Sequence, residues 1–280
     1  MKTVKVNASK SYNVIIGDGL LDSLGEYTRE AVGECKLCIV TDDKVDALYS
    51  ARAELSLKSS GYNTEKFVIK NGEASKNTAS LVALLEFLAK NRFTRSDCIV
   101  ALGGGVVGDL AGFAAGVYLR GIRFIQAPTT LLAAVDSSVG GKTAVDLEAG
   151  KNLAGVFHQP SLVLCDTRTL DTLDERIFSD GCAEVIKYAI INDKPMFERL
   201  KGGIKSDIER VIAECVAHKA EIVEKDEFDR GCRQLLNLGH TVGHGIESST
   251  QMSGLYHGEC VALGMIPMLI WRGDSRMFLV

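Results

Sequence analysis

The stretch "DCIVALGGGVVGDLAGFAAG", residues 97–116, combines a short apolar strand pattern with a helix pattern that follows it directly. Four glycines mark the junction: Gly103, Gly104, Gly105 and Gly108. Without side chains there, backbone N–H groups and the positive end of the helix can approach a phosphate. The spacing is not a strict GxGxxG, and close packing of a helix on a sheet also uses glycine. The stretch therefore predicts a strand, turn and helix, and both a dinucleotide site and tight helix packing explain its glycines.

Similar units extend outward from this stretch. β-branched and apolar runs recur at 12–17, 36–40, 65–70, 97–102, 124–128 and 162–166. The clearest helix pattern between them, residues 77–93, carries four leucines on one face and has Asn77 or Thr78 as its candidate cap; these are Leu81, Leu84, Leu85 and Leu88. Such alternation predicts an α/β domain with a largely parallel sheet.

From about residue 175 the pattern becomes helical throughout, as in residues 180–191 and 208–226. The sequence therefore predicts two domains, an α/β domain at 1–175 and an all-α domain at 176–280. No low-complexity linker separates them, so we expect an intimate boundary with a cleft, which is a common location for ligand sites.

Composition excludes several classes of protein. With 280 residues, of which 46% are hydrophobic, the chain can bury a sizeable core, and disorder is not expected. The net charge of −4 gives no overall attraction to nucleic acid or to an anionic membrane. No apolar run reaches the roughly 18 residues of a membrane span, and the N-terminus lacks the pattern of a signal peptide. The eight cysteines are scattered through apolar segments, and the lone pair Cys35 and Cys38 is interpreted as structural. We expect a cytoplasmic protein.

Two further polar features lie in the first part of the chain. Asp42 ends a predicted strand, where its carboxylate could accept hydrogen bonds from a ribose or could equally cap a helix. Residues 127–152 place many polar side chains beside an apolar strand end and predict an open loop that forms a site. Their "GGKT" does not complete a GxxxxGK[ST] motif because Asp136 occupies the first glycine position, which argues against a P-loop nucleotidase.

Three of the five histidines fall within residues 237–259. His240 and His244 are four residues apart and would share a helix face, while His257 follows a loop that contains glycine. Two imidazoles and a carboxylate form a usual catalytic zinc set with an open position. The carboxylate candidates are Glu247, Glu259 and Glu184. Spacing does not choose which two imidazoles bind, and a pair of histidines on a surface helix remains an alternative.

Seven blocks together resemble the 3-dehydroquinate synthase family, closely and in order. The blocks are "NGEASK" at 71–76, "GGGVVGDLAGFAAGVYLRG" at 103–121, "PTTLLAAVDSSVGGKTAVD" at 128–146, "KNLAGVFHQP" at 151–160, "GCAEVIKYAII" at 181–191, "RQLLNLGHTVGHGIE" at 233–247 and "YHGECVALGM" at 256–265. The resemblance extends over residues 1–268. It implies an NAD-binding α/β domain followed by an all-α metal-binding domain. It also implies conversion of 3-deoxy-D-arabino-heptulosonate 7-phosphate into 3-dehydroquinate and phosphate, in the shikimate pathway.

The resemblance also implies roles for single residues. One Zn²⁺ or Co²⁺ per subunit would be held by Glu184, His240 and His257. NAD would contact Asp42, Glu73, Lys76, Gly104, Gly105, Asp109, Thr129 and Thr130, together with Asp136, Lys142 and Lys151. The phosphorylated sugar acid would contact Lys142, Lys151, Asn152, Lys187, Lys219, Arg233, Asn237 and His244. The catalytic set would be His244, Lys142, Lys187, Asn237 and Arg233. Arg120 would reach the site of a neighbouring subunit, so a homodimer is expected.

Several positions depart from the family pattern. Asp174 stands where proline is expected, and Asp229 stands where glutamate is common. The pattern stops near Met268, whereas further helices and a late lysine are expected, so the helical domain is predicted to be incomplete at its end and to expose apolar surface. Two alternatives to the implied activity stay open: another sugar phosphate cyclase or polyol dehydrogenase on the same scaffold, and an inactive shortened chain.

Overall fold

The computed structural model describes residues 1–249 and 254–271. Seven strands form one sheet in the order β1, β2, β9, β6, β5, β3, β4. Their bounds are β1 Lys2–Val6, β2 Tyr12–Gly17, β3 Lys36–Asp42, β4 Asn63–Ile69, β5 Cys98–Gly103, β6 Arg123–Pro128 and β9 Leu162–Asp166. All neighbouring pairs are parallel except β1 with β2. The predicted, largely parallel sheet is confirmed, and each of the six predicted runs forms a strand; β1 was not predicted.

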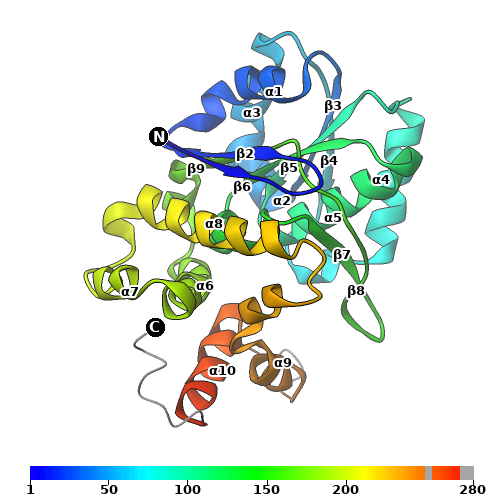
Figure 1. Ribbon diagram of the computed structural model, residues 1–280. Coiled ribbons are helices and arrows are strands. Elements are labelled where there is room, and N and C mark those ends of the chain that lie inside the picture. Colours follow the sequence, from blue (N-terminus) through cyan, green and yellow to red (C-terminus); the bar gives the residue numbers. More distant parts are fainter. Residues whose placement is uncertain (250–253, 272–280) are drawn as a thin grey trace.

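Helices cover both faces of the sheet, which explains why β5 is apolar along its whole length and fully buried. α1 (Leu24–Val32) and α3 (Ala51–Ser59) pack on one face, where α3 continues the short α2 (Asp43–Val45). α4 (Thr78–Lys90) and α5 (Gly105–Val117) pack on the other face (Figure 1). The predicted helix at 77–93 forms as α4, with Asn77 as its cap through a 2.9 Å hydrogen bond from the Ser80 N–H. Of its four leucines, Leu85 is the one that is only partly buried.

The glycine-rich stretch forms the predicted strand, turn and helix, and its glycines serve different purposes. A Cβ on Gly108 would lie 2.7 Å from Gln126 Oε1, and one on Gly112 would lie 2.4 Å from Thr143 Cγ2. Gly108 thus lets α5 approach β6 closely, and Gly112 lets it approach the segment that carries Thr143. At Gly104 and Gly105 the nearest atoms would be 3.1 and 3.2 Å from a Cβ and belong to the small side chains of Thr130 and Ser137. Gly104 and Gly105 are therefore less crowded than the helix face, whereas a Cβ on Gly103 would lie 2.6 Å from Val107 Cγ2.

The expectation of an open loop at residues 127–152 is wrong in part. Ala133–Ser137 form a π-helical turn, and β7 (Lys142–Leu147) pairs with β8 (Gly150–Phe157) in an antiparallel hairpin beside α5 (Figure 1). In the hairpin, the buried Thr143 and Val145 alternate with the less buried Lys142, Ala144 and Asp146, so that one face packs against α5. The charged residues around them concealed this alternation in the sequence.

Helices dominate the rest of the described chain. Their bounds are α6 Glu175–Asn192, α7 Lys194–Leu200, α8 Ile208–Lys225, α9 His240–Ser249 and α10 His257–Trp271. α6 and α8 pack against β1, β2 and β9 through one apolar cluster, and Figure 1 shows α6 to α10 gathered at one end of the molecule. Short 3-10 or π turns occupy Leu20–Ser23, Asp46–Ser50, Glu73–Ser75, Tyr118–Arg120, Thr167–Thr172, Lys205–Asp207 and Cys232–Asn237. The predicted division into domains at residues 175 and 176 stays a prediction.

α6 begins at the predicted change in pattern. Asp174 accepts a 2.9 Å hydrogen bond from the Arg176 N–H and so caps α6, which gives a physical reason for aspartate at this position.

Glycines allow three helices to meet closely. A Cβ on Gly264 of α10 would lie 2.1 Å from the Gly239 carbonyl oxygen, just before α9. A Cβ on Gly258 would lie 2.0 Å from the Asp180 carbonyl oxygen on α6. Backbone contacts this short are possible only for glycine. They hold the residue before α9 against the middle of α10, and the first turn of α10 against α6.

Leu263, Ile266 and Ile270 of α10 are exposed. The predicted incomplete end of the helical part stays a prediction. The segment after Met268, where the family pattern stops, lies largely outside the described residues, since only 269–271 are described and they complete α10. Within the described ranges, no helix combines the length and the apolar character that a membrane span requires.

Candidate active site

Glu184, His240 and His257 converge from three helices. Glu184 lies in the middle of α6, while His240 and His257 are the first residues of α9 and α10. Nε2 of His240 is 3.8 Å from Glu184 Oε1, and Nε2 of His257 is 4.0 Å from the same oxygen. One possible ligand atom from each residue lies within 4.8 Å of the others. Two imidazoles and one carboxylate at this separation can hold a divalent cation and leave coordination positions open.

The other carboxylates considered from the sequence have different partners. Glu259 forms a bidentate ion pair with Arg176, at 2.7 and 2.8 Å, which lowers its pKa to about 2. Glu247 accepts a hydrogen bond from Nδ1 of His257 at 3.2 Å. Glu184 is fully buried, and neither of its oxygens accepts a hydrogen bond within the described part of the chain, although Lys187 forms an ion pair with Oε2. A buried carboxylate oxygen left in this way is suited to a cation.

Charge around this cluster favours neutral imidazole at His240. Burial, followed by the positive charge of Lys187, lowers the pKa of His240 to about 3. At His257 burial lowers the pKa, but the hydrogen bond to Glu247 and the charge of Glu184 outweigh it, and the net shift is upward. Burial also raises the pKa of Glu184, against the opposing charge of Lys187.

His244 lies one turn beyond His240 and is exposed, so spacing correctly placed these two residues on one helix. Its ring centroid is 5.5 Å from that of His240 and 6.1 Å from that of His257. His244 also belongs to a second possible cluster with Glu247 and His257. An exposed imidazole beside a cation site is placed to exchange protons with a ligand or with water.

A second group of charges lies around Asp136. Lys219 donates to the Asp136 carbonyl oxygen and to Oδ1, both at 2.8 Å, and Tyr188 donates to Oδ1 at 2.5 Å. Burial raises the pKa of Asp136, but the charges of Lys219 and Lys187 outweigh it and hold this pKa below its usual range. Arg233, also buried, donates to the Gly140 carbonyl oxygen at 3.1 Å. Two cations from the helical part thus fix residues 136–140.

The glycine turn meets neighbouring strand ends at one edge of the sheet. The Thr129 N–H donates to the Gly103 carbonyl oxygen at 3.0 Å, and Thr130 lies against Gly104. In α5, just beyond its first turn, Asp109 accepts a 3.4 Å hydrogen bond from Lys76 Nζ. This arrangement brings the glycines, the two threonines, Lys76 and Asp109 together.

The hairpin links the glycine turn to the histidines. Lys76 also donates to Asn152 Oδ1 at 2.9 Å, and the neighbouring Lys151 Nζ lies 3.7 Å from Glu247 Oε2. Lys142, at the start of β7, pairs with Asp229. Residues separated widely in sequence therefore form one continuous set from α5 through the hairpin to α9 and α10.

Glu73 joins these contacts, since it pairs with Lys76 Nζ at 2.9 Å. Three other predicted residues lie apart from them or take other roles. Asp42 caps α2 by accepting 3.0 Å hydrogen bonds from the Lys44 and Val45 N–H groups, so one of its two proposed roles is observed. Asn237 is exposed just before α9. Arg120 is exposed beyond the far end of α5, about 20 Å along the helix from the glycine turn.

Sequence reasoning missed Tyr188 and the contact between Glu247 and His257. Tyr188 follows Glu184 by one helical turn, so a projection of α6 would have placed both side chains on the same face. The Glu247 contact depends on how α9 packs against α10, and the sequence carries no local signal for it.

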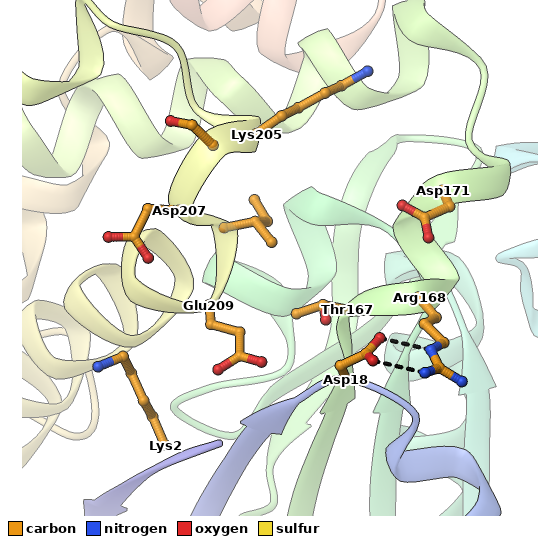
Figure 2. Close-up of a pocket in the computed structure, with 10 residues that line it drawn as sticks. Lys2, Asp18, Thr167, Arg168, Asp171, Lys205, Asp207 and Glu209 are labelled. Carbon is orange, nitrogen blue, oxygen red and sulfur yellow. Dashed lines mark hydrogen bonds and ion pairs between the residues drawn. The ribbon is translucent and has the colours of Figure 1, made fainter.

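A separate hollow of about 350 Å³ lies near the N-terminus, between Lys2, Arg168 and Glu209 (Figure 2). Its charges have both signs, and Figure 2 shows Arg168 paired with Asp18, at 2.7 Å for each contact. None of the predicted site residues lines this hollow, so the candidate site remains the cluster around Glu184 and the glycine turn.

Comparisons with known proteins agree with this geometry. A family model described as 3-dehydroquinate synthase N-terminal matches residues 66–180, and one described as 3-dehydroquinate synthase C-terminal matches residues 181–271. A 3-dehydroquinate synthase of Clostridium acetobutylicum is 47% identical over 271 residues, which cover 95% of this chain and 76% of that protein.

Two solved structures are similar over nearly the whole chain. A 2-deoxy-scyllo-inosose synthase complexed with carbaglucose-6-phosphate, NAD⁺ and Co²⁺ has a TM-score of 0.86 at 31% identity, covering 95% of this chain and 74% of that one. The 2-epi-5-epi-valiolone synthase of Streptomyces hygroscopicus subsp. jinggangensis, with NAD⁺ and Zn²⁺ bound, has a TM-score of 0.83 at 29% identity, covering 94% and 74%.

Proposed function

The chain belongs to the 3-dehydroquinate synthase family, and we propose that Glu184, His240 and His257 hold its divalent cation while the glycine turn holds its NAD. The activity is that of a lyase which converts 3-deoxy-D-arabino-heptulosonate 7-phosphate into 3-dehydroquinate and phosphate. The family depends on NAD and on a metal. The single observation that carries the assignment of the metal ligands is the buried Glu184 carboxylate that faces two imidazoles.

The residues fit these two groups chemically. When bound, Zn²⁺ or Co²⁺ supplies Lewis acidity at a substrate hydroxyl, and NAD supplies reversible acceptance of hydride. His240 is neutral well below pH 7 and can offer a lone pair without losing a proton first. Gly104 and Gly105 leave the start of α5 open to a pyrophosphate, with Thr129, Thr130, Lys76 and Asp109 around it.

We propose that cationic side chains bind the substrate, which carries a carboxylate and a phosphate. Its proposed contacts are Arg120 of a neighbouring subunit, Lys142, Lys151, Asn152, Lys187, Lys219, Arg233, Asn237 and His244. Three of these cations are buried, namely Lys187, Lys219 and Arg233. Burying three cations is costly unless anions meet them, so a neutral polyol substrate fits this site less well than an anionic one.

His244 is proposed to move protons during the elimination and ring-closure steps. It is outside the proposed ligand set, it is exposed, and its ring lies near those of His240 and His257. Replacement by alanine is expected to lower the rate by roughly 100-fold or more while cation binding is retained. Full activity of the variant would remove His244 from the mechanism.

We further propose that the chain acts as a cytoplasmic homodimer. The eight cysteines are all free, in line with a reducing compartment. Arg120 lies far along α5 from the glycine turn of its own chain, and both Leu119 (φ 50°) and Arg120 (φ 68°) adopt left-handed backbone angles. Non-glycine residues rarely occupy this region, and such strain is concentrated at functional positions. This turn is therefore proposed to present Arg120 to a second subunit.

Phosphate release tests the proposed function. The 280-residue chain is incubated with 3-deoxy-D-arabino-heptulosonate 7-phosphate, NAD⁺ and Zn²⁺ or Co²⁺, beside Glu184→Ala and Glu184→Gln variants. The exposed helix residue Glu86 provides a control in Glu86→Ala. We expect release from the parent and the control but not from the Glu184 variants. Net accumulation of NADH would instead indicate a dehydrogenase, and release from Glu184→Ala would contradict the ligand assignment.

A further inference from the structure

Glu247 lies directly behind one of the proposed metal ligands. Its Oε1 is 3.2 Å from Nδ1 of His257, while Nε2 on the other side of the same ring lies 4.0 Å from Glu184 Oε1. Because a carboxylate only accepts hydrogen bonds, Nδ1 carries the proton in this contact. The neutral ring then has its lone pair on Nε2, which faces Glu184.

Glu247 is itself held in place. Its side chain is 10% exposed, and Lys151 Nζ on the hairpin lies 3.7 Å from Oε2. Glu247 thus accepts through one oxygen from a histidine of α10 and faces a cation of the hairpin through the other.

We propose that Glu247 is a positioning residue that fixes the tautomer and ring orientation of His257, so that Nε2 is presented to the cation. This inference rests on the proposed ligand set. Carboxylates behind ligating histidines raise the basicity of the ring, and their loss typically lowers metal affinity by about 10- to 100-fold. Glu247 also contacts Lys151, and through this contact it connects the hairpin proposed to bind substrate with the proposed metal site.

The competing interpretation makes Glu247 a ligand of a second cation, together with His244 and His257, since these three also lie within reach of one another. The two interpretations differ at Nδ1 of His257. A ring that donates from Nδ1 to Glu247 cannot use Nδ1 as a ligand, and replacing His244 would then leave cation affinity unchanged.

Cobalt affinity of the full chain tests the proposal without any measurement of activity. Co²⁺ is titrated against a competing chelator into the parent, Glu247→Ala and Glu247→Gln, and its visible spectrum and stoichiometry are recorded. We expect one Co²⁺ per chain, an affinity about 10- to 100-fold lower in Glu247→Ala with an altered spectrum, and an affinity within about threefold of the parent in Glu247→Gln. Glutamine keeps an oxygen that can accept from Nδ1 and so should rescue the geometry.

The matched control is Glu259→Gln, which removes a carboxylate two residues from His257 that faces Arg176 instead. Its Co²⁺ affinity should stay within about threefold of the parent. If Glu247→Ala fails to fold, ¹⁵N-labelled histidine spectra of Glu247→Gln and the parent, both without metal, should show the same Nδ1–H tautomer at His257. Different tautomers there would overturn the proposal.

His257→Ala separates the failure of this inference from failure of the proposed function. Parent-like Co²⁺ affinity in His257→Ala would reject the ligand set itself. Loss of affinity in His257→Ala combined with parent-like affinity in Glu247→Ala would reject only the role of Glu247. A Co²⁺ affinity that falls in His244→Ala, or two Co²⁺ per chain, would identify the second cation site and overturn the positioning role.

Discussion

At Asp109 the fold favours the neutral carboxyl group. Burial raises the pKa of Asp109 to about 7, although the charge of Lys76 opposes this shift. The folded state therefore binds this proton more tightly than the unfolded chain, whose aspartates titrate near 4. The contribution to stability is complete below pH 4 and is lost as the pH rises through about 7.

The variant Asp109→Asn tests this pH dependence of stability, because asparagine has no proton to lose between pH 4 and pH 7. We expect the variant to gain stability relative to the parent between pH 4 and pH 7, at a slope of at most about 1.4 kcal/mol per pH unit. Urea unfolding of both proteins without NAD, at several pH values, measures the difference. A difference that stays constant with pH would show that Asp109 does not titrate in this range.

At the scale of elements, the packing of α10 against α9 determines the position of His257. Gly264 of α10 meets the Gly239 carbonyl oxygen, and a Cβ there would come within 2.1 Å. Gly264→Ala should therefore push α10 away from α9, destabilise the fold by about 1–3 kcal/mol and weaken Co²⁺ binding. Thermal unfolding and cobalt titration check the two effects together.

Gly245 of α9 provides the matched control, because it is exposed and a Cβ there would meet nothing within 4 Å. Gly245→Ala should stabilise the helix by about 0.5–1 kcal/mol and leave Co²⁺ affinity unchanged. Equal losses of affinity in the two variants would show that the helix contact does not position the histidine.

Other elements also show which parts of the fold sequence patterns predict and which they do not. Five of the six predicted strands lie inside the sheet and are mostly buried, as expected for apolar runs in a parallel sheet, whereas β4 lies at the sheet edge and is largely exposed or partly buried. The hairpin was missed because Lys142, Asp146 and Asn152 made its residues look like a loop, although Thr143 and Val145 alternate. Apolar runs predicted the strands, whereas the hairpin depends on the packing of one of its faces against α5.

The candidate site was only partly visible for a related reason. Spacing placed His240 and His244 on one helix, but it did not choose among Glu184, Glu247 and Glu259. That choice depends on which helix faces which, and it follows from backbone contacts at Gly239, Gly258 and Gly264 that no periodicity reveals. The family resemblance identified Glu184 as the ligand. The physical reason for that choice, its burial and its short distances to two histidines, came only from the structure.

For the whole molecule, a net charge of −4 coexists with an internal group of cations. Lys187, Lys219 and Arg233 are buried, and Glu184 and Asp136 offset part of their charge. The outer surface thus carries the acidity while the interior retains positive charge for an anionic ligand. This distribution explains why composition gave no sign of the substrate class.

The proposed homodimer leads to a test that uses two inactive chains. If Arg120 serves the neighbouring subunit, Arg120→Ala and Glu184→Ala should each be inactive alone. A mixed dimer would contain one site with both defects and one with neither. Random pairing makes half of the dimers mixed, so about a quarter of all sites should recover activity on co-expression.

Arg120→Lys paired with Glu184→Ala provides the companion experiment, because lysine keeps the charge but not the planar fork. Recovered phosphate release by the co-expressed Arg120→Ala and Glu184→Ala chains, isolated as one species of dimer mass, would place Arg120 in the partner's site. A dimer that forms without recovered activity would show that Arg120 acts in the site of its own subunit or has only a structural role. Activity of Arg120→Ala alone would remove it from the site altogether.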